Sequence, residues 1–402
     1  MNITPRPPTA SQKQFQQLIH EKSSNFVGRE FVFTAISDFL NHQPCGYFTI
    51  VGTPGSGKSA ILAKYVMENP SVVYYSAEVE GKNLSTEFLI TVCTQLTLRL
   101  RSGLKPRSLS VAEVSGVEAL IKEMGDTNVS LPDNATEGSW FFSLLLQKIS
   151  DLLQPDGRLI IAIDGCDRID LNNQFPDSNL FYLPRYLPER VYFLLTRRPF
   201  LSEKSGLLIE TPAQILDLEA YSEQNREDVQ TYIQEYISVT PSFLNNAGWR
   251  TNHSISEQEF CQQLTQQLTV KSENNFMYLN HILKAISQGF YPDSGSVALA
   301  IPLQFEPLPP GLEAYYKNHY QRIKGKGLSP VGFAILKCLA QLVQPVSVEL
   351  IAQVVDEDEY EVEKVLENWL EFLHQQIRGE ETFYSFYHSS FQNWLGKQLN
   401  LA

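Results

Sequence analysis

Short, nearly continuous apolar runs that alternate with helical patterns occupy the first half of the chain. Five runs have the length of a strand, namely residues 47–51, 72–75, 159–164, 191–196 and 215–218. Two segments between them, 85–101 and 139–153, have the apolar spacing of helices. Strands without polar alternation are typical of a parallel sheet that is buried on both faces. The pattern therefore predicts an α/β domain, a parallel sheet with helices on both faces.

The strand pattern stops after residue 219, and helical patterns follow. Ser222 can cap a helix whose apolar residues recur at helical spacing, namely Val229, Tyr232, Ile233, Tyr236 and Ile237. Residues 257–268 and 275–286 fit two further helices, and the proline-rich segment 301–311 separates them from the last part of the chain. We expect this region to be an all-α helical domain.

The last part of the chain begins near Ser329. Its pattern predicts helices over 331–342 and 348–355 and a long helix over 357–376, then a polar turn, a short strand in YSFYH and a final helix. Three helices followed by a pair of strands is the order of a winged helix. The candidate helix with the sequence YEVEKVLENWLEF contains one Lys against four Glu, so we interpret this domain as a packing and interaction module.

The domain organisation follows from these patterns and from a length of 402 residues, which is too long for one core. Residues 1–25 contain Pro5, Pro7 and Pro8 and are expected to be a tail or linker. We expect the α/β domain over 26–219, the helical domain and its linker over 220–325, and the winged helix over 326–402. Residues 102–137 have no clear period and are expected to be an irregular insertion.

Composition excludes several classes of protein. No run of 18 apolar residues occurs, so no membrane span is expected, and the N-terminus lacks the apolar segment of a secretory signal. Five scattered cysteines without a C-x-x-C pair are typical of reduced thiols in the cytoplasm. A net charge of −13 argues against a nucleic-acid partner, although a local basic strip could still exist.

A glycine-rich segment between a predicted strand and a predicted helix carries the clearest chemistry. Its letters G-T-P-G-S-G-K-S match the phosphate-loop pattern G-x-x-x-x-G-K-[ST]. Glycines let the backbone turn its N–H groups toward a phosphate at a helix N-terminus. Lys58 is expected to reach the β- and γ-phosphates, and the Ser59 hydroxyl to bind Mg²⁺. The nucleotide-binding residues expected here are Gly52, Thr53, Pro54, Gly55, Ser56, Gly57, Lys58, Ser59 and Ala60.

The second metal residue is expected at the end of another strand. Asp164 follows five apolar residues in RLIIAID, and a carboxylate in that place can hold Mg²⁺ through water. A strand that ends in Asp is common, so its place after the phosphate loop in an alternating pattern is what favours this role. We predict ATP or ADP with Mg²⁺ as the cofactors, and Ser59 and Asp164 as the metal residues.

Several weaker motifs, in order along the chain, resemble one family. These are FVGRE (26–30), IDGCDR (163–168), FLLTRRP (193–199), SENNFMYLNHIL (272–283), LPPGLEAYY (308–316) and FYHSSFQNWL (386–395). Together they resemble the signal-transduction ATPases with numerous domains (STAND), specifically the NACHT and NB-ARC-like group. The resemblance covers about residues 26 to 397. It implies a P-loop NTPase sheet of the AAA+-like kind, followed by a helical domain and a winged helix.

The resemblance also implies roles for single residues. Val27 and Arg29 would lie near the adenine and ribose, and Phe276 would lie against the base. Thr196 and Arg198 would read the γ-phosphate end, although Arg197 could be the sensor instead. His388 would reach the β-phosphate of ADP and make the winged helix a lid, although a lone His is more often structural.

Two positions depart from the family pattern. The family's usual Asp-Glu pair ends here as Asp167-Arg168, so the glutamate that often polarises water is missing, and Asp167 is the remaining candidate. Asn274 stands where the family often has Gly. Binding is expected to survive both differences, whereas fast hydrolysis is not expected. Lys58, Asp164, Asp167 and Arg198 are the predicted catalytic residues.

Two classes of function are compatible with these motifs. In the first, the chain is a slow ATPase used as a switch, whose ADP-bound closed form opens and oligomerises after exchange for ATP. In the second, it is an AAA+-like motor or clamp that remodels a protein or DNA. FVGRE begins only 26 residues into the chain, so effector and sensor segments are expected to be separate chains or to be missing. The resemblance suggests defence or regulatory signalling.

Overall fold

The computed structural model describes residues 10–79, 81–103, 131–132, 134–170, 174–175, 178–199, 206–240, 243–246, 256–287, 311–325, 329–342, 344–367, 369, 373–378, 381–386, 389–399 and 401. The chain forms two compact units. The first comprises Met1–Thr53 and Lys58–Gln224, and the second comprises Pro54–Gly57 and Asn225–Ala402. Most of the predicted insertion 102–137 lies outside the described residues.

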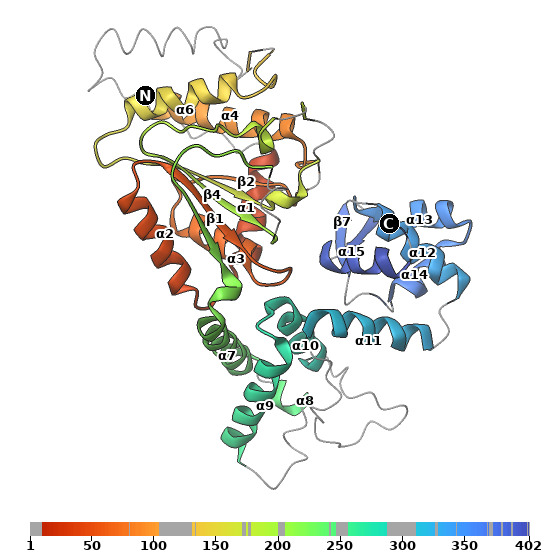
Figure 1. The fold of residues 1–402 in the computed structure, drawn as a ribbon. Coiled ribbons are helices and arrows are strands. Elements are labelled where there is room, and N and C mark those ends of the chain that lie inside the picture. Colours follow the sequence, from red (N-terminus) through yellow and green to blue (C-terminus); the bar gives the residue numbers. More distant parts are fainter. Residues whose placement is uncertain are drawn as a thin grey trace, which may run out of the picture. The chain divides into compact units, whose positions relative to one another are not determined.

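The first unit is built on a parallel sheet of five strands (Figure 1). Its strands are β1 (Gly46–Val51), β2 (Val73–Ser76), β3 (Leu159–Asp164), β4 (Val191–Arg197) and β5 (Ala213–Asp217), in the order β2-β3-β4-β1-β5. The predicted strands are confirmed to within two residues. The apolar runs of β1 and β4 are buried along their whole length, as expected for central strands, whereas the edge strand β5 is mostly exposed.

Helices cover both faces of this sheet. They are α1 (Ala10–Ser23), α2 (Glu30–His42), α3 (Lys58–Glu68), α4 (Ser85–Gly103) and α6 (Trp140–Leu152). Successive side chains of a strand point to opposite faces. In β4, the Phe193 ring meets Phe142 of α6, whereas the next ring, Tyr192, meets Phe39 of α2. The two helices therefore lie on opposite faces, and the predicted α/β fold with helices on both faces is confirmed.

The N-terminal helix α1 corrects the expectation that residues 1–25 are a tail or linker. Phe15 is only 4% exposed, and its ring meets the edges of Tyr74 and Tyr75 in β2 at centroid distances of 5.7 and 5.6 Å. Leu18 and Ile19 of the same helix are partly buried against this core, so Phe15 and its two apolar neighbours fasten a polar helix to the first unit. The prolines that suggested a linker all precede Ala10, so they do not interrupt the helix.

Among the described residues between 222 and 325, all regular elements are helices. They are α7 (Ser222–Val239), α8 (Phe243–Asn246), α9 (Glu257–Ser272), α10 (Phe276–Ser287) and α11 (Gly311–Gly325). The apolar stripe predicted for α7 is confirmed in part, since Val229, Ile233 and Ile237 are buried in the core of the second unit. An all-α segment therefore follows the sheet.

The end of the second unit has the element order of a winged helix (Figure 1). Its elements are α12 (Pro330–Gln341), β6 (Val346–Ser347), α13 (Val348–Val355), α14 (Glu359–Glu367), β7 (Leu373–Arg378), β8 (Glu381–Phe386) and α15 (Ser389–Gln398). The three strands form an antiparallel sheet in the order β6-β8-β7. Ser329 caps α12, and its hydroxyl accepts a hydrogen bond from the Gly332 N–H.

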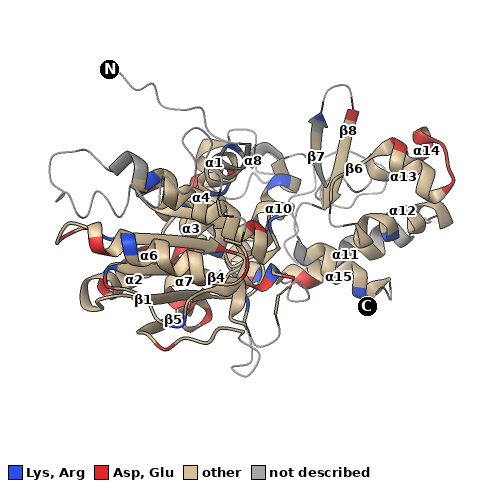
Figure 2. Cartoon of the chain, turned by 90° about the horizontal axis from the view of Figure 1, so that it is seen from above, with Lys and Arg blue, Asp and Glu red and all other residues tan. Residues whose placement is uncertain are grey.

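The predicted long helix over 357–376 is wrong in its second half. α14 ends at Glu367, and Leu373–Arg378 pairs with β8 as a strand of the wing. The antiparallel ladder with β8 outweighs the local helical preference of this segment. Acidic side chains gather at the turn between α13 and α14, at Asp356, Glu357, Asp358 and Glu359 (Figure 2).

Within the described residues, no helix combines the length and the apolar character needed to cross a membrane.

Candidate functional site

The phosphate loop joins β1 to α3 at the carboxyl end of the sheet. β1 ends at Val51, and α3 begins at Lys58. Gly55 and Gly57 have φ angles of +84° and +91°, which glycine adopts without strain. The loop therefore has the strand–turn–helix context that a phosphate-binding loop requires, with the N-terminus of α3 at its end.

The Lys58 ammonium lies inside this loop. Its Nζ atom donates hydrogen bonds to the carbonyl oxygens of Gly52 at 2.7 Å and Thr53 at 2.9 Å. Burial lowers the pKa of Lys58, and the charges of Asp167 and Asp164 act in the opposite direction. The lysine is thus held at the loop by two carbonyl groups, with which a phosphate can compete.

Asp164 joins three elements of the first unit at the end of β3. Its Oδ1 atom accepts hydrogen bonds from the Ser59 hydroxyl at 3.0 Å and from the Thr196 hydroxyl at 2.5 Å. The Thr196 hydroxyl oxygen in turn accepts from the N–H of Gly165 at 2.9 Å. The structure therefore brings the predicted pair Ser59 and Asp164 together, and it gives Thr196 the role of orienting the carboxylate.

The second oxygen of this carboxylate is available to a cation. Asp164 is 1% exposed, and its Oδ2 atom is buried without a hydrogen-bond partner. Burial raises the pKa of Asp164 to about 6, the charge of Glu78 adds to the rise, and the bond from Thr196 opposes it. A buried carboxylate oxygen without a partner is costly, and a bound cation would remove this cost.

The donor set at Ser59 and Asp164 fits Mg²⁺. Within the described part of the chain, no group of three or more His, Cys, Asp or Glu side chains could hold a metal by itself. Mg²⁺ is usually bound through one or two carboxylates together with water and substrate phosphates, and a single buried Asp beside a Ser hydroxyl meets that requirement.

Asp167 and Arg198 bind each other. The Arg198 Nε atom lies 3.1 Å from Asp167 Oδ2, and the backbone N–H of Arg198 donates to Asp167 Oδ1 at 3.1 Å. Asp167 was predicted as the candidate catalytic carboxylate and Arg198 as the sensor. In this structure both oxygens of Asp167 are engaged by Arg198.

Glu78 is a carboxylate at this edge that sequence reasoning missed. It follows β2, and its Cγ atom lies 3.0 Å from the position that a Cβ atom on Gly165 would take. The only sequence signal was an acidic residue shortly after a predicted strand. Its proximity to Asp164 depends on the pairing of β2 with β3, which no local pattern specifies.

The tip of the phosphate loop belongs to the second unit, where it contacts the start of α10. The Asn275 side-chain amide donates to the Pro54 carbonyl at 2.8 Å, and the Phe276 N–H donates to the Gly55 carbonyl at 3.0 Å. Asn275 also caps α10, since its Oδ1 atom accepts from the Tyr278 N–H at 3.0 Å. Sequence reasoning missed Asn275, although an Asn before an apolar helix is a capping signal.

Asn274, which differs from the Gly that the resemblance implied at this position, has a left-handed backbone conformation. Its φ angle is +60°, and the preceding Glu273 has a φ angle of +50°. Asn tolerates the left-handed region better than most residues, so the departure from Gly leaves this turn intact.

The predicted base contacts remain predictions. Arg29 is 2% exposed at the start of α2, with its guanidinium 5.9 Å from the centre of the Phe31 ring, and Val27 is half-buried. The Phe276 ring meets Tyr232 of α7 at a centroid distance of 5.6 Å. His388 lies outside the described residues.

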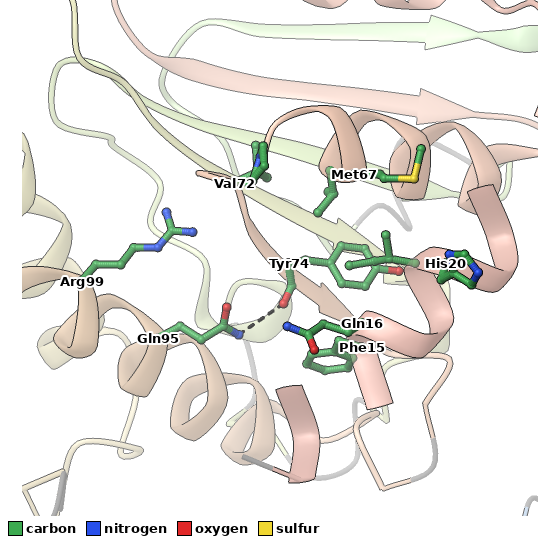
Figure 3. A pocket seen from close by; sticks show the side chains of 11 residues that line it. Phe15, Gln16, His20, Met67, Val72, Tyr74, Gln95 and Arg99 are labelled. Atoms are coloured by element: carbon green, nitrogen blue, oxygen red, sulfur yellow. Dashed lines mark hydrogen bonds between the residues drawn. The ribbon is translucent and has the colours of Figure 1, made fainter. Parts of the chain in front are cut away.

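A separate cavity of about 440 Å³ lies in the first unit beside the edge strand β2 (Figure 3). Gln95 of α4 donates to the Tyr74 carbonyl at 3.2 Å, and Arg99 donates to the Ser71 carbonyl. α1 supplies Phe15 and His20 to its wall. Side chains of α4 thus occupy carbonyl groups next to and within the edge strand, which protects this edge from pairing with another strand.

Residues 25–187 match the family model described as an AAA ATPase domain. This segment contains the phosphate loop, Asp164 and the strands β1, β2 and β3. No curated protein matches the chain in sequence. The family match, the parallel sheet and the loop geometry together support a nucleotide-binding P-loop ATPase domain.

Three solved structures are similar to this chain. A STAND protein with a tetratricopeptide repeat sensor from Pyrococcus horikoshii is 16% identical with a TM-score of 0.42, and the match covers 94% of this chain and 45% of that one. A Drosophila ORC structure bound to DNA is 12% identical (TM-score 0.37; 96% and 99% covered), and RuvB from Thermotoga maritima is 13% identical (0.30; 94% and 98%). This chain thus spans less than half of the Pyrococcus protein, and likeness at this level assigns it none of their activities.

Proposed function

We propose that this P-loop NTPase is an ATP/ADP-operated switch that hydrolyses ATP slowly to reset its state. The observation that carries the proposal is the arrangement around Asp164, where the Ser59 hydroxyl and a partnerless carboxylate oxygen meet beside the phosphate loop. Such an arrangement can hold a metal–nucleotide complex with little rearrangement of the Ser59 and Asp164 side chains.

In the proposed bound state, Lys58 exchanges the carbonyls of Gly52 and Thr53 for phosphate oxygens. Ser59 and Asp164 hold Mg²⁺, which neutralises phosphate charge when it is bound. Thr196 keeps the Asp164 carboxylate in place through its hydroxyl. Each of these residues acts by binding or orienting, which are the main contributions of a protein to phosphoryl transfer.

Slow turnover is supported by the state of Asp167. A carboxylate that already accepts two hydrogen bonds from Arg198 is a poor acceptor for a proton from water. Arg168 follows it, in the place where the resemblance implied a glutamate. A site that binds well and turns over slowly keeps one nucleotide state long enough to signal.

The switch requires that nucleotide favour one conformation over another. The hydrogen bonds of Asn275 and Phe276 to the loop tip can couple the nucleotide to α10, because a change in the loop conformation would change these bonds. We further propose that the nucleotide state controls opening and homo-oligomerisation, and that effector and sensor functions reside on other segments or chains. The NACHT or NB-ARC-like assignment, a role in defence signalling and a cytoplasmic location, which the five free thiols support, belong to the same proposal.

The second candidate function is a motor or clamp that remodels a protein or DNA. The DNA form of this alternative is disfavoured by the winged helix, since α14 carries Glu359, Glu361 and Glu363 and follows an acidic turn (Figure 2). A phosphate backbone repels such a surface. Steady turnover well above one per minute would favour the motor.

The test is to purify the chain without added nucleotide, denature it and identify the released nucleotide by chromatography. Close to one ADP per chain is the expected result, and Lys58→Ala is expected to release none. An empty wild-type site that binds added nucleotide only transiently would refute the latched switch and favour the motor. A wild-type chain that binds neither ATP nor ADP would refute nucleotide-dependent function altogether.

A further inference from the structure

Glu78 is placed by the pairing of β2 with β3. Ser76 lies opposite Asp164 in the register of these two strands, and the Ala77 N–H donates to the Asp164 carbonyl at 2.9 Å. Glu78 therefore comes directly after a residue whose backbone is hydrogen-bonded to Asp164, the residue predicted to bind the metal. Parallel strands end at the same edge of a sheet, and in open α/β sheets ligands bind at that edge.

The Glu78 side chain extends over Gly165, the residue that follows Asp164. A Cβ atom on Gly165 would lie 3.0 Å from Glu78 Cγ and 3.4 Å from Arg168 Cγ. Glu78 and Arg168 therefore both approach a glycine whose lack of a side chain leaves room for them, and its φ angle of +73° favours glycine as well.

The charge of Glu78 acts on the phosphate-binding groups. Burial is the main cause of the lowered pKa of Lys58, and Glu78 is among the carboxylates that oppose this effect. Glu78 is also the charged group that adds most to the raised pKa of Asp164, after burial. Its carboxylate thus lies within electrostatic reach of both the phosphate lysine and the metal carboxylate.

The Glu78 carboxylate makes fewer and longer polar contacts than the Asp167 carboxylate does. Its carboxylate has one ion pair among the described residues, with Lys22 of α1 at 3.8 Å, which is longer than a hydrogen bond. Its side chain is 23% exposed, so water can reach it. By contrast, both oxygens of Asp167 are engaged by Arg198 at 3.1 Å.

We propose that Glu78 is the catalytic base of ATP hydrolysis in this chain. It would take the role of the glutamate that the resemblance implied at position 168, where this chain has Arg168. The proposal rests on the proposed function, because it assigns the hydrolytic step of the same site. A water molecule forms a new O–P bond to the γ-phosphorus, the bond from that phosphorus to the ADP oxygen breaks, and the water proton passes to the Glu78 carboxylate. The products are ADP and inorganic phosphate.

The ion pair with Lys22 gives the N-terminal helix a part in this step. Lys22 lies in the last turn of α1, which Phe15 fastens to β2. The ammonium attracts the Glu78 carboxylate and holds it at the edge of the sheet. Lys22 is thus a positioning residue, and its replacement by Gln is expected to lower turnover several-fold without changing nucleotide affinity.

The experiment compares Glu78→Gln with the wild type and with Glu68→Gln, a matched control that removes one carboxylate from an ion pair with Lys64 on α3. Affinity for a fluorescent ADP analogue and single-turnover hydrolysis of radiolabelled ATP are measured for each. General bases contribute about 10²- to 10⁴-fold, so Glu78→Gln is expected to slow hydrolysis at least about 100-fold and to change ADP affinity less than about threefold. Purified Glu78→Gln protein is expected to retain ATP where the wild type retains ADP.

The outcomes separate this proposal from the proposed function. Hydrolysis by Glu78→Gln within about threefold of wild type would overturn the assignment, and a large loss in Asp167→Asn alone would transfer the role to Asp167. A wild type that binds ATP but never hydrolyses it would also overturn the assignment while leaving nucleotide binding intact. Absence of binding in the wild type would overturn the proposed function itself.

Discussion

The substitution Asp164→Asn tests the electrostatic description of the site without nucleotide. The Asp164 carboxyl is 1% exposed, and its Oδ2 atom has no hydrogen-bond partner. Burial, together with the charge of Glu78, raises its pKa from 3.8 to about 6. The folded state therefore binds this proton more tightly than the unfolded state does.

The sign and size of the effect follow from linkage. Because the folded pKa is raised, the stability that this group contributes is fully present below pH 3.8 and is lost as pH rises toward and through 6. Each pKa unit is worth 1.36 kcal/mol, so a pKa raised by about 2 contributes about 3 kcal/mol to the free energy of unfolding at low pH. About 2 kcal/mol of this contribution is lost between pH 4 and pH 7.5. Asparagine carries no charge, so the variant lacks this loss.

The assay is urea unfolding of both proteins in EDTA, without nucleotide, at pH 4 and pH 7.5. The transition that Mg–ADP shifts in the wild type reports on the first unit. The stability of Asp164→Asn relative to wild type is expected to rise by about 2 kcal/mol between the two pH values. Any constant cost from the new amide cancels in this difference.

The refuting result is a relative stability that stays constant, or that falls, between pH 4 and pH 7.5. A second measurement adds Mg–ATP to the same unfolding assay without EDTA. At about 100 times its dissociation constant, Mg–ATP is expected to stabilise the wild type by about 2.7 kcal/mol, and it is expected to stabilise the variant by much less. Equal stabilisation of both proteins would show that Asp164 does not take part in metal binding.

Two further substitutions test contacts that the structure alone revealed. Asn275→Ser keeps a capping oxygen for the Tyr278 N–H but loses the amide that donates to the Pro54 carbonyl. ADP affinity is expected to fall about fivefold, the equivalent of one hydrogen bond of about 1 kcal/mol, while adenosine affinity stays unchanged. Unchanged ADP affinity would contradict this prediction. Ser329→Ala, which removes the cap of α12, is the control and is expected to lower stability by about 1 kcal/mol without changing ADP affinity. Phe15→Ala is expected to cost about 3–5 kcal/mol in thermal or urea unfolding, whereas Phe175→Ala, at a side chain 68% exposed, stays within about 0.5 kcal/mol; equal melting of the two variants would mean that α1 is not part of the core.

Local signals in the sequence predicted the elements that depend on neighbouring residues. The central strands β1, β3 and β4 were predictable because their long apolar runs can be buried only in the middle of a sheet. The phosphate loop was recognisable because its chemistry needs Gly, Lys and Ser at a fixed spacing on one short segment. Asp164 was predicted for the same reason, as the polar end of a buried strand.

The sequence by itself thus determined a P-loop sheet, its phosphate loop and the identity of the lysine, serine and aspartate beside it. Only the tertiary structure decided which distant residues meet them. Strand pairing places Glu78 beside Gly165. Packing of Phe15, Leu18 and Ile19 makes the helix over residues 10–23 part of the core, and a ladder with β8 converts the end of a predicted helix into a strand. These features depend on contacts between residues far apart in the chain, whose energies no local pattern of hydrophobic and polar positions contains.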